Sequence, residues 1–222
     1  MIPLAQRLRD DLVTGLFLDR DGVINVKAPP GQYITSPDEL VLLRGAAVAI
    51  RHVNNLGIPV YIVTNQRWVA RRHDGIERIR AIHDRLAALL GFVDAYVDGI
   101  YTCVHEINRC ECRKPKRGLV DQALRYNPRL ALSSSVMVGD AETDIELAAR
   151  CGMYSVRVFA SNENTRPAAH ERTRAQQTAA DLYSAVVGER ISDGYQLTGA
   201  QVNSAPPTKG GNGRTLASSG SD

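Results

Sequence analysis

Two aspartates one residue apart, Asp19 and Asp21, follow a short apolar run and precede Gly22. The run 16–18 has the composition of a buried strand, and residues two apart on an extended chain point to the same side. One carboxylate of such a pair can attack phosphorus while the other protonates the leaving oxygen. A calcium loop is disfavoured, because the following residues supply no oxygen ligands at alternate positions. The alternative is a strand that simply ends in a polar turn.

Further polar groups stand at the ends of other apolar runs. Thr64 and Asn65 end one run, and Asp140 ends another. The Thr64 hydroxyl and the backbone amides after it can hold phosphoryl oxygens, and Asp140 can bind Mg²⁺, which prefers oxygen ligands. Asp144 either orients a neighbouring lysine or caps a helix. Taken alone, Thr64 also fits an ordinary polar strand end.

A compact basic run, Arg113-Lys114-Pro115-Lys116, precedes a short helical pattern. Pro115 restricts the backbone next to Lys114, so the Lys114 side chain can be held in place. A transferring phosphoryl dianion beside Asp19 needs such a cation. The alternative is a solvated basic surface.

Four soft metal ligands fall within ten residues: Cys103, His105, Cys110 and Cys112. This set fits a structural Cys₃His zinc site. The alternatives are unligated buried thiols or a redox disulfide, and disulfides are rare in the cytosol. Cys151 stands apart and fits a core position.

Apolar periodicity predicts strands that alternate with helices. A capping box of Asp74 with Glu77 is expected to start the longest helix. Alternation of this kind implies an α/β fold with a doubly wound parallel sheet, whose ligands bind beyond the carboxyl ends of the strands. Strands are expected at 16–18, 60–63, 99–102, 136–138 and 154–158, helices around 46–53, 76–90, 119–126, 145–149 and 182–187, a lead-in at 1–11 and an irregular loop at 26–40.

Composition limits the partners of this chain of 222 residues. Aromatic residues make up only 5% and the net charge is +3, which disfavours nucleic acid as a partner and suits a small anionic substrate. No apolar run approaches membrane-spanning length and the N-terminus lacks a signal-peptide core, so a cytoplasmic monomer without membrane contact is expected. Residues 1–190 are expected to form the domain, and residues 191–222 a disordered tail.

Four motifs occur in order: Asp19-x-Asp21-Gly22-Val23, Thr64-Asn65-Gln66, Lys114 in Cys-Arg-Lys-Pro, and Gly139-Asp140-x-x-x-Asp144. Together they resemble the haloacid dehalogenase phosphatase superfamily. The Cys-x-His and Cys-x-Cys-Arg-Lys-Pro segments resemble the branch of D-glycero-D-manno-heptose 1,7-bisphosphate phosphatases and histidinol-phosphatases. Residues 32–34 and 37–40 fit the first loop of the heptose enzymes, and the resemblance extends over residues 16–187.

The resemblance implies a Rossmann-like core without a large inserted cap, a nucleophile at Asp19 and a general acid/base at Asp21. It implies Mg²⁺ held by the Asp19 carboxylate, the backbone carbonyl of Asp21 and Asp140. Thr64 and Lys114 would steady the phosphoryl group, and Arg113 would help to recognise the substrate. The complete set of expected substrate-binding residues is Tyr33, Thr64, Asn65, Gln66, Arg67, Arg113 and Lys114.

The chain departs from the branch in three places. The segment 67–72, with Trp68, replaces a loop of small residues, Ala141 stands where the heptose enzymes often carry lysine, and the zinc loop is short with Val104 in place of proline. Arg67, Arg71 or Arg72 can meet a second anion. The alternative is that these arginines only solvate a helix start, which is the preferred interpretation for Arg72. Trp68 is expected to narrow the pocket and to stack on a sugar or exclude it.

These features predict a phosphoric monoester hydrolase that depends on magnesium and forms an aspartyl-phosphate. The expected reaction removes the C7 phosphate of D-glycero-D-manno-heptose 1,7-bisphosphate. Histidinol phosphate or another small phosphorylated metabolite is the alternative substrate. A non-catalytic, zinc-stabilised binding protein of the same fold is a different reading, and a polynucleotide-end phosphatase is disfavoured by the low aromatic content.

Overall fold

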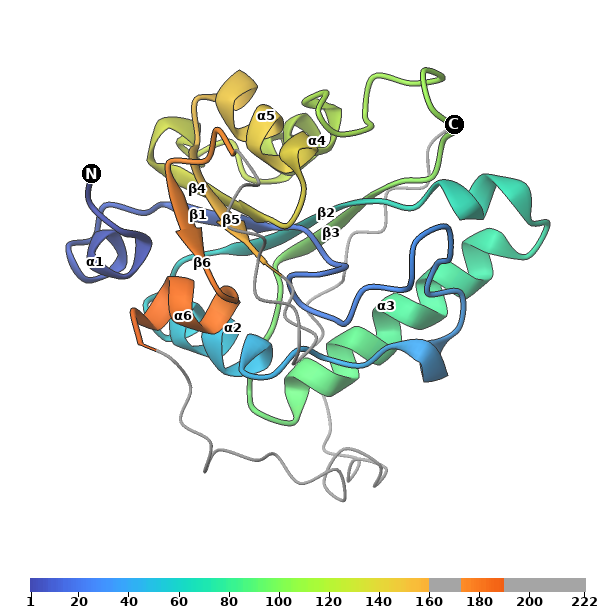
Figure 1. Cartoon of the computed structure of the whole chain (residues 1–222), viewed down its shortest axis with the longest axis horizontal. Coiled ribbons are helices and arrows are strands. Elements are labelled where there is room, and N and C mark those ends of the chain that lie inside the picture. Colours follow the sequence, from blue (N-terminus) through green and yellow to red (C-terminus); the bar gives the residue numbers. More distant parts are fainter. Residues whose placement is uncertain (160–172, 190–222) are drawn as a thin grey trace.

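The structure, a computed structural model, describes residues 1–159 and 173–189 (Figure 1). Its centre is a parallel sheet of six strands in the order β3-β2-β1-β4-β5-β6. The order reverses between β1 and β4, so the carboxyl ends of these two strands form the crevice where such sheets bind ligands. The strands are β1 (Gly15–Leu18), β2 (Val60–Asn65), β3 (Gly99–Cys103), β4 (Ser135–Gly139), β5 (Tyr154–Val158) and β6 (Gln177–Ala179).

Helices cover both faces of the sheet. In Figure 1, α2, α3 and α6 lie on one side, whereas α4 and α5 lie on the other. The described helices are α1 (Leu4–Arg9), α2 (Ala46–Asn55), α3 (Gly75–Gly91), α4 (Gly118–Tyr126), α5 (Glu142–Cys151) and α6 (Leu182–Val187), with 3₁₀ turns η1 (Pro37–Glu39), η2 (Arg67–Arg71) and η3 (Leu132–Ser134). The predicted doubly wound α/β fold is confirmed, with η1 as the only helical element between β1 and α2 in this described segment.

The two apolar clusters follow from the alternation of side chains along β1. Leu16 and Leu18 point into the cluster that contains α2, α3 and α6, whereas Phe17 points into the cluster under α4 and α5. The Phe17 ring lies 5.2 Å from that of Tyr61, centroid to centroid. Both faces of β1 are therefore buried, which explains its unbroken apolar run.

The predicted lead-in at residues 1–11 is wrong, because it contains α1. Leu4 and Leu8 lie one helical turn apart and are both buried, and α1 packs against α6. The Leu4 backbone amide also donates to Gln177 Oε1 at 2.7 Å. Gln177 belongs to β6, a short edge strand that the apolar pattern did not predict.

The predicted capping box at Asp74 is also wrong. The Asp74 side chain makes no capping hydrogen bond to α3. Its carboxylate instead accepts from Arg72 Nε at 2.9 Å and from Arg78 Nε at 2.5 Å. Two guanidinium groups outcompete the backbone for this acid because charge-assisted bonds are the stronger ones.

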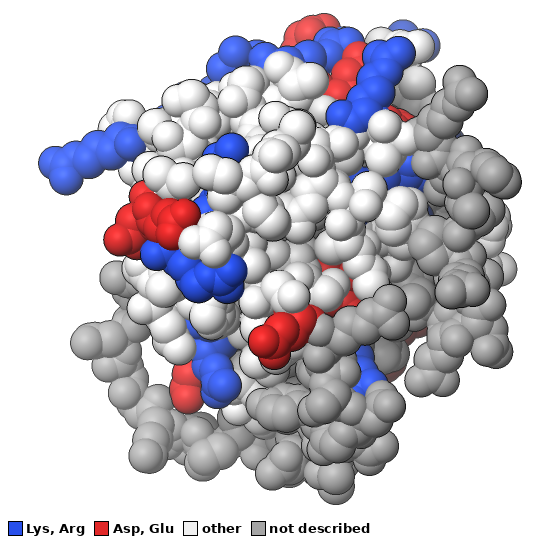
Figure 2. Space-filling model, turned by 60° about the vertical axis from the view of Figure 1, so that its left-hand side comes forward, with Lys and Arg blue, Asp and Glu red and all other residues white. Residues whose placement is uncertain are grey.

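Charge on the face drawn in Figure 2 is mixed rather than segregated. Lys and Arg stand singly or beside Asp and Glu, and uncharged surface separates these groups. No helix within residues 1–159 and 173–189 is long and apolar enough to cross a bilayer. The predicted tail, 191–222, lies outside the described residues.

Candidate active site and metal sites

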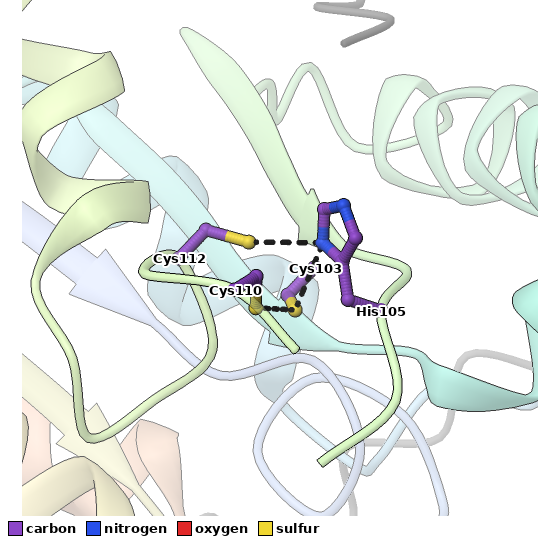
Figure 3. A group of neighbouring side chains, drawn as sticks. All are labelled: Cys103, His105, Cys110 and Cys112. Carbon is purple, nitrogen blue, oxygen red and sulfur yellow. Dashed lines mark hydrogen bonds between the residues drawn. The ribbon is translucent and has the colours of Figure 1, made fainter. Parts of the chain in front are cut away.

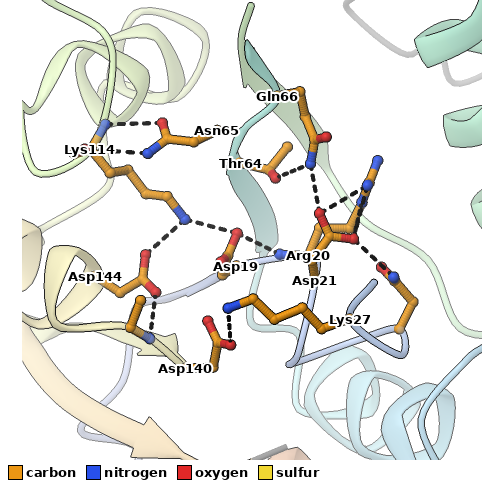
Figure 4. Close-up of polar contacts among 12 residues, drawn as sticks. Asp19, Arg20, Asp21, Lys27, Thr64, Asn65, Gln66, Lys114, Asp140 and Asp144 are labelled. Atoms are coloured by element: carbon orange, nitrogen blue, oxygen red, sulfur yellow. Dashed lines mark hydrogen bonds and ion pairs between the residues drawn. The ribbon is translucent and has the colours of Figure 1, made fainter. Parts of the chain in front are cut away.

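Most of the expected site residues meet at the carboxyl ends of β1, β2 and β4 (Figure 4). Asp19 follows β1 directly, Thr64 and Asn65 end β2, and Asp140 follows β4. The argument that placed Asp19 and Asp21 on one strand face is wrong, because β1 ends at Leu18. Asp21 lies instead in a turn. A hydrogen bond from the Gly22 amide to the Asn25 carbonyl, at 2.8 Å, closes this turn.

Two glycines let the carboxylates come close to the neighbouring backbone. Gly22 has a φ of 86°, and a Cβ there would lie 2.5 Å from Asp140 Oδ2. A Cβ on Gly139 would overlap the Asp144 side chain. Only glycine therefore fits at these two positions, which explains why the acids lie beside glycines in the sequence.

Lys114 is the buried cation of the site. Its Nζ lies 2.8 Å from Asp19 Oδ1 and 2.7 Å from Asp144 Oδ1, and its side chain is only 2% exposed. Burial alone would lower the pKa of Lys114, but the charges of Asp144 and Asp19 hold it above its usual range. Burial raises the pKa of Asp144 to about 7, against the attraction of Lys114. The ammonium is thus charged and fixed beside Asp19.

Asp144 also fulfils the second role considered for it. Its Oδ2 accepts from the backbone amide of Ala141 at 3.2 Å, at the start of α5. The same carboxylate therefore caps the helix with one oxygen and holds Lys114 with the other.

Asn65 clamps the backbone of Lys114. The Lys114 amide donates to Asn65 Oδ1 at 3.1 Å, and Asn65 Nδ2 donates to the Lys114 carbonyl at 3.2 Å. This paired contact joins the end of β2 to the segment after the cysteine cluster. Both polar atoms of the Asn65 side chain are thus engaged with the backbone that carries this cation. The neighbouring Arg113 has a buried Nη1 without a hydrogen-bond partner among the described residues.

Arg20, which the sequence reasoning did not select, is fully buried and pairs with Asp21. Arg20 Nη2 lies 2.8 and 2.9 Å from the two Asp21 oxygens, and Nε lies 3.1 Å from Oδ1. Asn25 Nδ2 and Gln66 Nε2 also donate to the Asp21 carboxylate, at 2.9 and 2.8 Å. Burial would raise the pKa of Asp21, but Arg20 and these hydrogen bonds lower it. The position of Arg20 between two aspartates in the sequence was the feature that could have indicated this ion pair.

Trp68 does not line the pocket as predicted. It is 3% exposed and lies in the core, so it cannot stack on a substrate. Its indole Nε1 donates to Gln66 Oε1 at 2.9 Å. Gln66 Nε2 in turn donates to Thr64 Oγ1 at 2.8 Å as well as to Asp21. Gln66 is therefore fully engaged within the protein.

The arginines of segment 67–72 differ in their partners. Arg71 pairs with Glu106 and Arg72 with Asp74, so neither is left to meet a second anion. Arg67 has no ion-pair partner among the described residues. Its Nε donates to the Tyr33 hydroxyl and its guanidinium lies 5.7 Å from the Tyr33 ring centroid. Arg67 is thus the arginine of this segment without an acidic partner in the described chain.

The acids Asp19, Asp140 and Asp144 offer oxygens within 4.8 Å of one another. Asp140 Oδ1 is buried and lacks a hydrogen-bond partner within the described chain, as expected of an oxygen that serves a metal. Lys27 Nζ lies 2.5 Å from Asp140 Oδ2, a contact that the sequence reasoning missed. Burial and the charge of Asp19 raise the pKa of Asp140. The donor set fits a hard divalent cation.

The four soft ligands come together as predicted (Figure 3). Their ligand atoms lie within 4.8 Å of one another, and none of the cysteines is in a disulfide. Cys103 Sγ lies 3.6 Å from Cys110 Sγ, and Cys112 Sγ lies 3.3 Å from His105 Nδ1. The hydrogen bond from Cys112 lowers the pKa of Cys103 to about 5, which favours the thiolate. The donor set fits a tetrahedral zinc ion.

Comparison with known proteins identifies relatives that share this sequence pattern. A family described as HAD-hydrolase-like matches residues 111–185. The D-glycero-D-manno-heptose-1,7-bisphosphate 7-phosphatase of Thermosynechococcus vestitus is 36% identical over 156 residues, which cover 64% of this chain and 77% of that protein. The D-glycero-alpha-D-manno-heptose-1,7-bisphosphate 7-phosphatase of Mycobacterium bovis is 37% identical over 134 residues, covering 60% and 70%.

A crystal structure shows the same similarity. The D,D-heptose 1,7-bisphosphate phosphatase of B. bronchiseptica, complexed with magnesium and phosphate, superposes with a TM-score of 0.67 at 31% identity. The superposition covers 78% of this chain and 96% of that structure.

A parallel sheet with acids at its switch point and a buried lysine beside them defines a phosphoryl-transfer enzyme of the haloacid dehalogenase type. The chain belongs to this superfamily, in the branch of the heptose-bisphosphate 7-phosphatases. The predicted resemblance and the predicted class, a phosphoric monoester hydrolase, are confirmed.

Proposed function

We propose that this protein removes the C7 phosphate of a D-glycero-D-manno-heptose 1,7-bisphosphate, with Asp19 as nucleophile. The observation that carries the chemistry is the Lys114 ammonium, held 2.8 Å from Asp19 at the switch point of the sheet. The names of the relatives support the substrate.

Asp19 attacks phosphorus, the bond from phosphorus to the C7 oxygen breaks, and Asp21 delivers a proton to that oxygen. Water then attacks the phosphoryl-Asp19, Asp21 takes up the proton of that water, and phosphate leaves. Arg20 and its neighbours keep the Asp21 carboxylate of the free enzyme ionised. The proton that Asp21 delivers therefore enters with the substrate, which binds as the phosphate monoanion. Lys114 and the Thr64 hydroxyl hold the phosphoryl oxygens.

Asp19, the carbonyl of Asp21 and Asp140 would hold Mg²⁺. When bound, the ion neutralises phosphoryl charge and orients the transferring group. The orphaned Asp140 oxygen supports this assignment.

Zinc at Cys103, His105, Cys110 and Cys112 has a structural role in this proposal. The cluster immediately precedes Arg113 and Lys114, so it braces the segment that delivers both cations. We further propose a cytoplasmic monomer whose phosphatase domain spans residues 1–190, with residues 191–222 as a tail.

Arg67 and Tyr33 support a substrate with two anions. Lys114 serves the transferring phosphoryl group, whereas Arg67 has no acid of its own in the described chain and offers a planar fork of donors to the C1 phosphate. Histidinol phosphate, the alternative substrate, has a single phosphate and gains nothing from Arg67. The unpaired arginine therefore favours the bisphosphate.

The test compares kcat/KM for the heptose bisphosphate, as both anomers, with kcat/KM for histidinol phosphate. The bisphosphate is expected to be the better substrate, and Arg67→Ala is expected to raise its KM about tenfold without the same effect on histidinol phosphate. Arg72→Ala is the matched control, because Arg72 is paired with Asp74. A tenfold preference for histidinol phosphate would overturn the assignment.

A further inference from the structure

We propose that Trp68 is a positioning residue, which acts through Gln66 to set the hydrogen-bond direction at both Asp21 and Thr64. The inference rests on the proposed function, in which Asp21 moves a proton and Thr64 holds phosphate. It starts from three buried contacts that form one chain: Trp68 to Gln66, Gln66 to Asp21, and Gln66 to Thr64.

The first contact decides which way the Gln66 amide faces. An indole N–H is only a donor, so at 2.9 Å it must face the carbonyl oxygen of the amide. The amide nitrogen then has to face the other way, toward Asp21 Oδ2 and Thr64 Oγ1, both at 2.8 Å. All polar atoms of the Gln66 side chain are thereby paired at a position that is 1% exposed.

The opposite amide orientation would be costly at both ends. It would turn a carbonyl oxygen toward the Asp21 carboxylate and leave the Trp68 N–H against an N–H group. Each buried polar group left without a partner destabilises that orientation. Trp68 therefore holds the amide in the orientation that Asp21 also requires, through a contact with Gln66 alone.

The chosen orientation also determines what Thr64 can do. A hydroxyl carries one donor and two acceptor sites. Since Gln66 Nε2 donates to Thr64 Oγ1, the Thr64 hydroxyl hydrogen remains free to be donated. A phosphoryl oxygen needs a donor of this kind, so a tryptophan in the core directs the polarity of the phosphate-binding end of β2.

The contact itself can be tested without any activity measurement. The chain has one tryptophan, so its indole N–H gives a single side-chain signal in a proton–nitrogen correlation spectrum. Gln66→Leu removes the acceptor and should move this signal upfield and speed its hydrogen exchange. Gln66→Glu offers a charged acceptor and should move it downfield. If the chemical shift and exchange rate of the indole N–H stay the same in both variants, the proposal is overturned, whichever substrate the protein hydrolyses.

The positioning role is tested by kinetics with p-nitrophenyl phosphate. Trp68→Phe keeps most of the ring and removes the N–H, so kcat should fall about tenfold with little change in KM. In a Gln66→Leu background, Trp68→Phe should cause no further loss of kcat. Additive losses in the double variant would show that Trp68 acts only through packing and would overturn the proposal.

Val69→Ala is the matched control for packing. Val69 is the next residue in η2 and is buried in the same apolar cluster, but it donates no side-chain hydrogen bond. It should lower the melting temperature as much as Trp68→Phe or more and leave kcat and the indole signal near wild type. If Val69→Ala lowers kcat as far as Trp68→Phe, the proposed role is refuted.

Discussion

Replacing Lys114 by methionine should destabilise the protein by an amount that grows with pH. The ammonium lies between Asp19 and Asp144, and its side chain is 2% exposed. Removing one partner of a buried ion pair costs about 3–5 kcal/mol, because the remaining charge stays buried without compensation. That is a large fraction of the roughly 5–15 kcal/mol that stabilises a domain.

The pH dependence follows from Asp144. Burial already raises its pKa to about 7 while Lys114 opposes the shift. Without Lys114 the pKa rises further, and folded Asp144 keeps a proton that the unfolded chain releases. A group of this kind stabilises the folded state at low pH, and each pH unit upward removes up to about 1.4 kcal/mol until the folded pKa is passed. The free energy of unfolding of Lys114→Met should therefore fall further below that of wild type at pH 8 than at pH 6.

The assay is urea unfolding of wild type, Lys114→Met and Lys114→Met/Asp144→Asn at both pH values. Asparagine keeps the size of Asp144 and can still accept from the Ala141 amide, but it carries no charge. The double variant should recover most of the lost stability at pH 8 while remaining inactive. The reasoning is refuted if the single variant is as stable as wild type at pH 8, or if the double variant is no more stable than the single one.

Three further predictions concern other parts of the molecule. Cys110→Ser should lower zinc content and phosphatase activity together, and zinc-free reduced wild-type protein, found by elemental analysis, would contradict the zinc assignment. Burial lowers the pKa of His83 to about 3, with Arg20 acting in the same direction. His83 therefore stays neutral in the folded state while the unfolded state binds a proton below about pH 6.5, so His83→Phe should remove about 1.4 kcal/mol of the stability that wild type loses between pH 7.5 and 5.5. An unchanged loss in urea unfolding would refute this. Lys27→Met should raise Mg²⁺ affinity about two- to fivefold in calorimetry, because the Lys27 ammonium on one Asp140 oxygen repels a cation held by the other, whereas Lys27→Arg keeps the charge and should not.

The sequence predicted β1, β2, β4 and β5, which are buried on both faces, and β3, an edge strand whose burial alternates along its length. It did not predict β6, since Gln177–Ala179 has no apolar run and exists through its pairing with β5. It did not predict α1 either. That helix has no side-chain cap and is stabilised by packing on α6, a contact with the far end of the described chain.

For the site, the sequence predicted the main acids, Lys114 and the soft-ligand cluster. These residues follow strand ends or lie close together in the chain, so topology brings them together. Contacts between side chains that are distant in the sequence could not be predicted from local sequence patterns. Arg71 and Arg72 looked like free cations until their acids were known, and Trp68 looked like a pocket residue although it lies in the core. A side chain's exposure depends on what packs over it, which periodicity does not report.

The central claim is that Asp19 becomes phosphorylated during turnover. The nitrophenolate of p-nitrophenyl phosphate leaves without protonation, so hydrolysis of the intermediate should be the slow step and the intermediate should accumulate. Acid quench of the wild-type enzyme with Mg²⁺ in mid-turnover, followed by peptide mass spectrometry, should find one added phosphoryl group on Asp19. Asp19→Asn should carry none and should turn over at least about 10³-fold more slowly. Steady turnover with no phosphoryl group on Asp19, or with the group on another residue, would contradict the account.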